Sequence, residues 1–271
     1  MRKRHLLLFL VTLHVLFIDL TYATEPISQD NEQDAIPVIN KQSQTMVIAI
    51  QGKISKNLLT SIIKITQKLP LEDKFPPYLM VLLDSNGGDG EAAIEIGKLL
   101  RKFNAHVFVT NRCGSACVFV YAGGVFRASL PSSIGIHQPR VTLSDSGARI
   151  IKELDTSKNE TAQNMLTSFD SKADDYFNRM GITPGFYNRI QSQKTKELHW
   201  LDEKELEKYK INGFSEEYLD ILIRNINGRM THPMDRDRVI MNSLNVLKEC
   251  SYWKNEPSNF TKCYMSTILK D

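Results

Sequence analysis

The chain has 271 residues, of which 42% are hydrophobic and 24% are charged, and its formal net charge is +3. This composition is typical of a globular protein and argues against a chain that is disordered throughout. The small net charge, and the absence of a basic tract with interleaved aromatic residues beyond the first few positions, argue against nucleic-acid binding.

The N-terminus has the pattern of a secretory signal peptide. A basic stretch, MRKRH, precedes the apolar run LLLFLVTLHVLFIDL, and Thr21 and Ala23 supply the small residues of a cleavage site. We expect residues 1–23 to be removed and the protein to be exported, either to the periplasm or out of the cell. The alternative is an uncleaved membrane anchor, although His14 and Asp19 interrupt a run that is already short for a span.

The first half of the chain alternates predicted strands and helices. The continuous apolar runs YLMVLLD and AHVFVTN predict strands that are buried on both faces. The resulting strand–helix–strand rhythm predicts an α/β fold with a mainly parallel sheet. The expected elements are a flexible leader (24–44), a strand (45–54), a helix capped by Ser55 (55–69), a strand (78–84), a glycine turn and helix (85–103), a strand (105–111), a turn at Ser115 with an apolar helix ending at Gly123–Gly124, and a strand (132–137).

The second half is richer in helix signals. Residues 142–158 are polar and are expected to form a loop. Apolar residues then recur at a spacing of three to four through 160–181, which predicts a long helix. Residues 197–213 predict a short strand and a helix, with Asp202 as N-cap and Glu205 completing a capping box.

Four cysteines suit an exported protein, because disulfides persist in oxidising compartments. Cys250 and Cys263 lie in a helical C-terminal extension (214–271) and enclose a short polar loop, so we expect a local disulfide worth about 3 kcal/mol. Cys113 and Cys117 stand four residues apart, where a bridge and a pair of buried free thiols are both open. No second Cys or His pair stands nearby at ligand spacing, so neither a metal nor a cofactor is predicted.

Ser115 and His137 are the candidate catalytic side chains. A serine at the start of a helix lies beside main-chain amides that have no helical partner, and Gly114 and Ala116 leave the approach to it open. A histidine at the end of a neighbouring strand is suited to act as its base. The simpler reading also stays open, with Ser115 as a helix cap and His137 as a hydrogen-bonded core residue.

Two segments, LLDSNGGDGEAAIEIGKLLRKF and CGSACVFVYAGGVFRASLPSSIGIHQP, resemble the proteolytic subunit of Clp-type serine peptidases, in the ClpP/crotonase superfamily. The resemblance extends over roughly residues 45–213. The matching features, in order, are Ser85-Asn86-Gly87-Gly88, Ser115, Ala122-Gly123, Arg127, Leu130-Pro131 and Ile136-His137-Gln138-Pro139.

The resemblance implies a ClpP-like catalytic domain over 45–213, built from stacked ββα units. It implies Ser115 as nucleophile and His137 as general base. The main-chain amides of Gly87 and Ala116 would form the oxyanion hole. The predicted helix at 160–181 corresponds to the family's segment for contacts between subunits, which implies a homo-oligomer.

Two departures from the family pattern concern the site itself. Asn86 replaces the proline of the glycine motif. The family's acidic residue aligns near Leu198, so the third catalytic residue is expected to be the adjacent Glu197, with Asp202 as the alternative. The remaining possibilities are a Ser–His dyad and a chain that has lost activity, since triad enzymes without the orienting carboxylate lose orders of magnitude in rate.

These features together predict an exported, ATP-independent serine peptidase that cleaves peptides or flexible protein segments. ATP is not available outside the inner membrane and the chain has no Walker motif, so no ATPase partner is expected. The alternative is a catalytically weak or inactive ClpP-fold protein that serves as a binding or scaffold module. Acyl-CoA chemistry of the crotonase type is disfavoured by the signal peptide.

Overall fold

The computed structural model describes residues 38–42, 45–71, 77, 79–144, 150–228, 230, 232–250 and 256–270. The predicted signal peptide lies outside these residues. The strands are β1 (Val38–Gln42), β2 (Thr45–Gln51), β3 (Leu79–Ser85), β4 (His106–Gly114), β5 (Phe126–Ala128), β6 (Ile134–Ile136), β7 (Thr142–Ser144), β8 (Ile150–Glu153), β9 (His199–Trp200) and β10 (Gly213–Phe214). The helices are α1 (Lys56–Thr66), α2 (Gly90–Lys102), α3 (Cys117–Ala122), α4 (Glu160–Arg179), α5 (Phe186–Gln191), α6 (Glu203–Lys208), α7 (Glu216–Asn227), α8 (Arg236–Cys250) and α9 (Pro257–Ile268).

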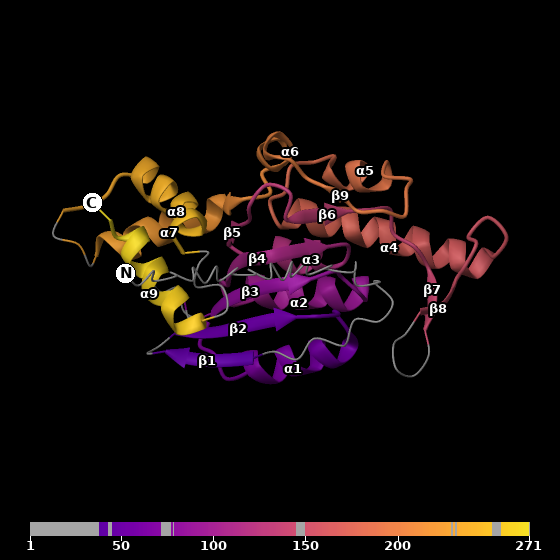
Figure 1. Ribbon diagram of the computed structural model, residues 1–271, viewed down its shortest axis with the longest axis horizontal. Helices are drawn as coiled ribbons and strands as arrows, with labels where there is room; N and C mark the ends of the chain where they lie inside the picture. Colours follow the sequence, from indigo (N-terminus) through magenta and orange to yellow (C-terminus); the bar gives the residue numbers. More distant parts are fainter. Residues whose placement is uncertain are drawn as a thin grey trace, which may run out of the picture.

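The main sheet has the order β1-β2-β3-β4-β5-β10, and β6 joins it by pairing with both β4 and β9. The pairings at its centre, β2–β3, β3–β4, β4–β5 and β4–β6, are parallel, whereas β1, β9 and β10 pair antiparallel with their neighbours. The mixed α/β fold with a mainly parallel sheet is therefore confirmed. Figure 1 shows this sheet through the middle of the molecule, with α7, α8 and α9 at one end and the β7–β8 hairpin at the other.

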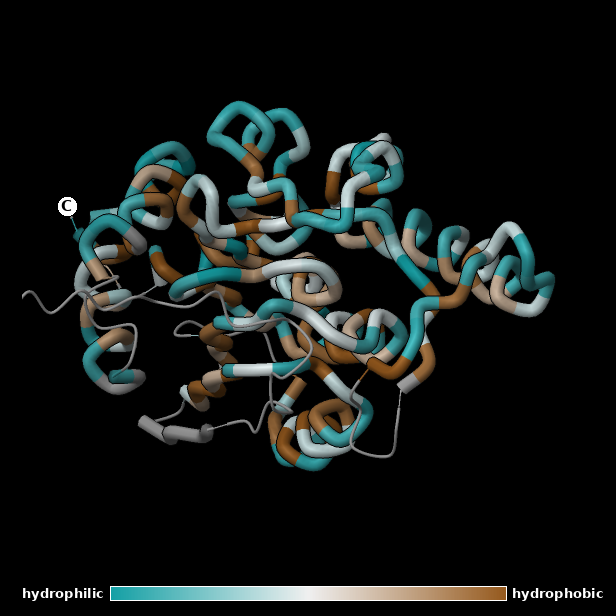
Figure 2. The backbone as a smooth tube through the Cα atoms, turned by 45° about the vertical axis from the view of Figure 1, so that its right-hand side comes forward, coloured by the Kyte–Doolittle hydropathy of each residue, from teal (hydrophilic) through white to brown (hydrophobic). Residues whose placement is uncertain are grey.

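Both faces of the central strands are buried, as their continuous apolar sequences predict. Alternate side chains of β3 point to opposite layers: Val81 and Leu83 pack with α1 to α6, whereas Met80 and Leu82 pack with α7 to α9. Hydrophilic and hydrophobic residues alternate along the helices (Figure 2), as expected for helices with one buried face. The C-terminal extension is therefore the second layer of the core, since it covers one face of the sheet.

Two segments form strands where the sequence predicts irregular chain. Residues 38–42, within the expected leader, form β1, whose main chain pairs with the edge of β2 from Val38–Ala49 to Gln42–Thr45. Within the loop expected over 142–158, β7 and β8 form an antiparallel hairpin. Main-chain pairing with a partner strand supplies hydrogen bonds that an apolar pattern does not reveal, so neither strand could be read from side chains alone.

Helix starts follow the predicted capping residues. The Ser55 side chain accepts a hydrogen bond from the Leu58 N–H, and Asp202 with Glu205 forms a complete capping box on α6. The long helix predicted over 160–181 is α4, and its N-cap is Asn159. No helix in the described ranges has the length and apolar character needed to cross a bilayer.

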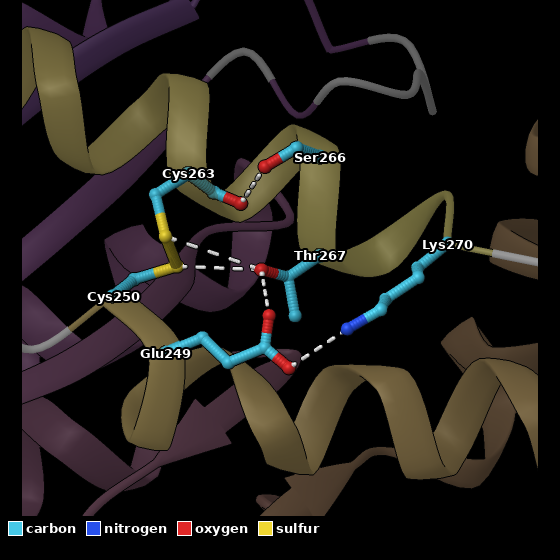
Figure 3. Close-up of a disulfide and its surroundings, with 6 residues drawn as sticks. All are labelled: Glu249, Cys250, Cys263, Ser266, Thr267 and Lys270. Carbon is cyan, nitrogen blue, oxygen red and sulfur yellow. Dashed lines mark hydrogen bonds and ion pairs between the residues drawn. A yellow bond between two sulfur atoms is a disulfide. The ribbon is translucent and has the colours of Figure 1, made fainter.

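The predicted disulfide of the extension joins Cys250, at the end of α8, to Cys263 on α9. Figure 3 shows the surrounding contacts, in which Glu249 accepts hydrogen bonds from the Thr267 hydroxyl at 3.2 Å and from the Lys270 ammonium at 3.5 Å. These contacts fix α9 against α8. Because α9 also packs on the sheet, the disulfide holds the second layer together.

A fully buried arginine, Arg127 on β5, points into the layer that contains α3, α4 and α6. Its guanidinium donates hydrogen bonds to main-chain carbonyls only: those of Ala122, Gly124, Met180, Lys210 and Ile211. Burial lowers its pKa to about 10, so it stays charged at neutral pH. Carbonyl dipoles at the ends of α3, α4 and α6 thus take the place of a carboxylate partner.

Candidate active site

Ser115 lies in the turn between β4 and α3 and has a left-handed main chain, with φ +53°. This conformation is uncommon for a non-glycine residue, and the surrounding structure can hold it in place. Two features do so here. The Ser115 N–H donates to the Gly135 carbonyl at 2.8 Å, and a disulfide joins Cys113, before the turn, to Cys117, after it. The bridge between these two cysteines, left open by the sequence, is therefore formed.

His137 directly follows β6 and lies at the same edge of the sheet as Ser115. The strands β4 and β6 are parallel, and Gly114 is paired with Gly135. Because parallel strands end at the same edge, the residues just beyond them are brought together. Ser115 and His137 line one cleft, whose volume is about 1500 Å³. No hydrogen bond joins their side chains within the described structure.

The cleft runs from the glycine turn to the hairpin. One wall is formed by the segments around Ile54 and Gly88, the other by α4 and by β7 and β8. Its lining mixes apolar side chains with both signs of charge. The charged residues along it are Lys53, Lys56, Asp89, Glu91, Arg140, Glu153, Lys172 and Lys196. A cleft of this length and mixed character suits an extended peptide better than a small apolar ligand.

The His137 ring is half-buried, and its Nδ1 lies 2.8 Å from the Gln138 carbonyl oxygen. Partial burial lowers the pKa of the imidazole below its usual range. The Gln138 carbonyl raises that pKa, Arg140 lowers it and Glu153 raises it, in decreasing order of effect. His137 is therefore neutral at pH 7, which is the state that a general base requires.

The glycine turn presses against the serine turn. An added Cβ on Gly87 would lie 2.7 Å from the Ser115 Cβ and 3.0 Å from the Ala116 nitrogen. The Gly87 N–H donates to the Ser85 hydroxyl at 3.1 Å, so this predicted oxyanion donor has a partner within its own loop. The Ala116 N–H, the other predicted donor, has no acceptor among the described residues.

The sequence pointed to the amides of the Gly87–Gly88 turn together, and the resemblance to Gly87 in particular; the structure separates the two residues. Hydrogen bonds from Ile54 N–H to the Gly87 carbonyl and from Asp89 N–H to the Ile54 carbonyl flank Gly88. In such a bridge the main chain of Gly88 itself faces the other way, away from Ile54. Gly88 is exposed and lines the cleft. Gly88 and Gly87 differ in the direction in which their main-chain N–H groups point. The dipeptide Gly-Gly does not reveal this difference.

The two carboxylates predicted as the third catalytic residue have other surroundings in the structure. The Asp202 carboxylate accepts from the Glu205 N–H at 2.8 Å as the cap of α6. Glu197 is exposed and does not line the cleft. The antiparallel pairing of Ile136 with His199, continued by one residue, brings Leu198 opposite His137.

Glu153, on β8, lines the same cleft, and its charge raises the pKa of His137 by less than Arg140 lowers it. It forms ion pairs with Arg140 at 3.2 Å and with Lys196 at 2.9 Å. Sequence reasoning missed this residue, because 142–158 reads as a polar loop. The signal that could have found it was the apolar pair Ile150–Ile151 just before it, which a hairpin strand would explain.

Solved structures that match this chain include two of ClpP1. One is a point mutant of ClpP1 from Listeria monocytogenes: it is 21% identical, the match covers 64% of this chain and 93% of that chain, and the TM-score is 0.46. The other, ClpP1 from Listeria monocytogenes, is 18% identical, with 61% of this chain and 88% of that chain covered and a TM-score of 0.42. No protein-family model matches the chain, and no curated protein matches it.

Proposed function

We propose that the chain is an exported, ATP-independent serine peptidase that cleaves peptides or flexible protein segments. The observation that carries this proposal is the pairing of a strained serine with a neutral histidine at one edge of a parallel sheet. Ser115 has φ +53° in a turn closed by a disulfide, and His137 follows the neighbouring strand. A helix cap needs neither the strain nor the cleft that both residues line.

The chemistry follows from the groups present. The Ser115 hydroxyl attacks the carbonyl carbon of a bound peptide, while His137 Nε2 takes its proton. The negative charge that develops on the carbonyl oxygen needs donors fixed in advance. We place these at the N–H groups of Ala116 and Gly88, because the Gly87 N–H already donates to Ser85. His137 then gives its proton to the leaving amine, and water hydrolyses the acyl-enzyme by the same steps in reverse.

Two further features belong to the proposal. Export is supported by the disulfides Cys113–Cys117 and Cys250–Cys263, since such bonds form and persist in oxidising compartments. A homo-oligomer that uses α4 also belongs to the proposal; Met165 on that helix is 57% exposed and also lines the cleft.

The test is labelling with a fluorophosphonate probe of protein purified after export, with both disulfides intact. Wild type should be labelled on Ser115, and Ser115→Ala and His137→Ala should each abolish labelling. Lys98→Ala, on the exposed face of α2, is the matched control and should label like wild type. A folded wild-type protein that resists the probe over a pH range of about 6 to 9 would overturn the proposal.

A second candidate function is a binding or scaffold protein on the same fold. The observation in its favour is Leu198, which stands opposite His137 in place of a carboxylate. In that case Ser115→Ala would leave the biological effect of the protein intact. A phenotype that depends on Ser115 would exclude this second candidate.

A further inference from the structure

A main-chain carbonyl determines which ring nitrogen of neutral His137 carries the proton. A carbonyl oxygen only accepts hydrogen bonds, so the 2.8 Å contact with Gln138 requires the proton on Nδ1. The neutral ring then has its lone pair on Nε2. In a Ser–His–acid triad, holding the ring in this tautomer is one of the two tasks of the acidic residue. Here the carbonyl of the next residue in the chain performs that task.

The second task of a triad acid is to stabilise the imidazolium that forms during reaction, and this requires a negative charge nearby. Glu153 is the carboxylate on the hairpin side of the cleft, where it is ion-paired with Arg140 and Lys196. It lies on β8, paired with Thr142 on β7, and the Leu154 N–H donates to the Val141 carbonyl at 2.9 Å. This pairing fixes Glu153 beside the chain that leaves His137, on the wall of the same cleft.

The other charged groups around the ring explain why Glu153 is ionised. Its hydrogen bond with Lys196 and the charge of Arg140 lower the pKa of its carboxyl group. Arg140 is also the cation that acts on His137 from the ring's own segment. Across the cleft, Glu91 is paired with Lys172 at 2.9 Å, and Asp89 caps α2.

We propose that the role of a triad acid is divided in this protein: the Gln138 carbonyl fixes the tautomer of His137, and Glu153, on the β7–β8 hairpin, is the positioning residue whose charge supports the imidazolium. The inference rests on the proposed function, because it assigns a role at that site. It replaces both Glu197 and Asp202, and it makes the hairpin part of the catalytic apparatus. Formation of β7–β8 then completes the site.

The test measures His137 directly and does not require turnover. In the Ser115→Ala protein, with its disulfides intact, nitrogen-15 NMR should show the neutral His137 ring protonated on Nδ1. Glu153→Gln should lower the pH midpoint of the His137 titration, because an attractive charge is lost and Arg140 is left unopposed. Glu197→Gln and Asp202→Asn should leave that midpoint in place.

A second variant, expected to shift the His137 midpoint in the opposite direction, distinguishes a charge effect from a general structural effect. Arg140→Gln removes a repulsive cation and frees Glu153 from one ion pair, so it should raise the His137 midpoint. A proton on Nε2, a midpoint that Glu153→Gln does not lower, or equal shifts in the Glu197→Gln protein would each overturn the inference.

Labelling kinetics separate this inference from the proposed function. If Ser115 reacts with the probe, Glu153→Gln should slow labelling at a pH of about 8 by about tenfold and move the acidic limb of the pH profile downward. If the wild type does not react, the peptidase proposal fails, whereas the NMR titration still decides whether Glu153 and Gln138 control His137.

Discussion

Gly87 and Ser115 are far apart in the chain, yet no side chain fits between them. A methyl group on Gly87 would lie 2.7 Å from the Ser115 Cβ and 2.8 Å from the Gly114 carbonyl oxygen. Gly87 also has φ +113°, a conformation that favours glycine. The glycine turn and the serine turn are therefore fitted to each other, and each limits where the other can lie.

Gly87→Ala should abolish or strongly reduce labelling of Ser115, by at least about tenfold, because the added methyl displaces the serine turn. The matched control is Gly181→Ala: Gly181 also has a positive φ, of +70°, but an added Cβ there meets nothing within 4 Å. The control should lose about 1 kcal/mol of stability through backbone strain and keep its labelling. Equal labelling by the two variants would contradict the packing argument.

The Cys113–Cys117 disulfide should be needed for an active serine. Thiol titration of the unreduced protein should find no free thiol, since all four cysteines are bridged. A Cys113→Ala/Cys117→Ala protein should fold but react with the fluorophosphonate at least about tenfold more slowly, because the left-handed turn loses its covalent constraint. Unchanged labelling would show that the hydrogen bond to Gly135 suffices.

The second disulfide provides the control for the first. Cys250→Ala/Cys263→Ala should lower the free energy of unfolding by about 3 kcal/mol, according to its loop length. The bridge joins α8 to α9 on the other face of the sheet, so the labelling rate at Ser115 should be unaffected in the folded protein. Thermal denaturation and labelling, measured on the same samples, separate the two effects.

Leu198→Asp should strengthen the site. The sheet register brings residue 198 opposite His137, so a carboxylate there would raise the pKa of the imidazole and stabilise its protonated form. We expect labelling of Ser115 to accelerate by about tenfold or more, with its acidic limb moved upward. Leu198→Asn, which has nearly the same shape without the charge, should not accelerate labelling. A decrease in both variants would mean that the leucine packs where no polar side chain is tolerated.

His106 should make the protein sensitive to acid. It is fully buried at the start of β4, its Nδ1 lies 2.7 Å from the Tyr264 hydroxyl, and burial lowers its pKa to about 3. The unfolded chain binds a proton near pH 6.5 and the folded one does not, so stability is complete above that pH and falls below it. The loss should be at most about 1.4 kcal/mol per pH unit between about 6.5 and 3.

His106→Phe removes this titration and keeps an aromatic ring among Phe126, Phe214 and Tyr218. The free energy of unfolding should be measured by denaturant at several pH values between about 4 and 7. Its slope against pH should be smaller than in wild type, because about one proton fewer is bound on unfolding. Identical slopes in the two proteins would show that other groups cause the acid sensitivity.

Much of the secondary structure could be predicted from residue patterns within short segments. The runs at β3 and β4 are mostly apolar, so strands buried on both faces were the expected result, and Ser55 and Asp202 cap the helices that they precede. The spacing of Cys250 and Cys263 likewise pointed to a bridge. Each of these signals lies within one short segment, where the residue pattern and the structure correspond directly.

What could not be predicted depends on segments that meet in space. Glu153 reaches the cleft that His137 lines only because β8 folds back on β7, and the sequence of the hairpin region is largely polar. Gly87 and Gly88 differ only in the direction of their amides, which the bridge to Ile54 decides. The tautomer of His137 depends on a main-chain carbonyl, a group that every residue carries. None of these relationships leaves a pattern of residue types.

The buried Arg127 determines how the chain can be divided. Its guanidinium is satisfied partly by carbonyls of Lys210 and Ile211, the latter 84 residues further along the chain. A polypeptide cut between α5 and α6, or one still emerging from the ribosome at that point, would enclose a cation that lacks two of its five acceptors. We therefore expect closure of the strands around Arg127 to require the α6 segment. No fragment that ends before residue 211 should then be a stable unit.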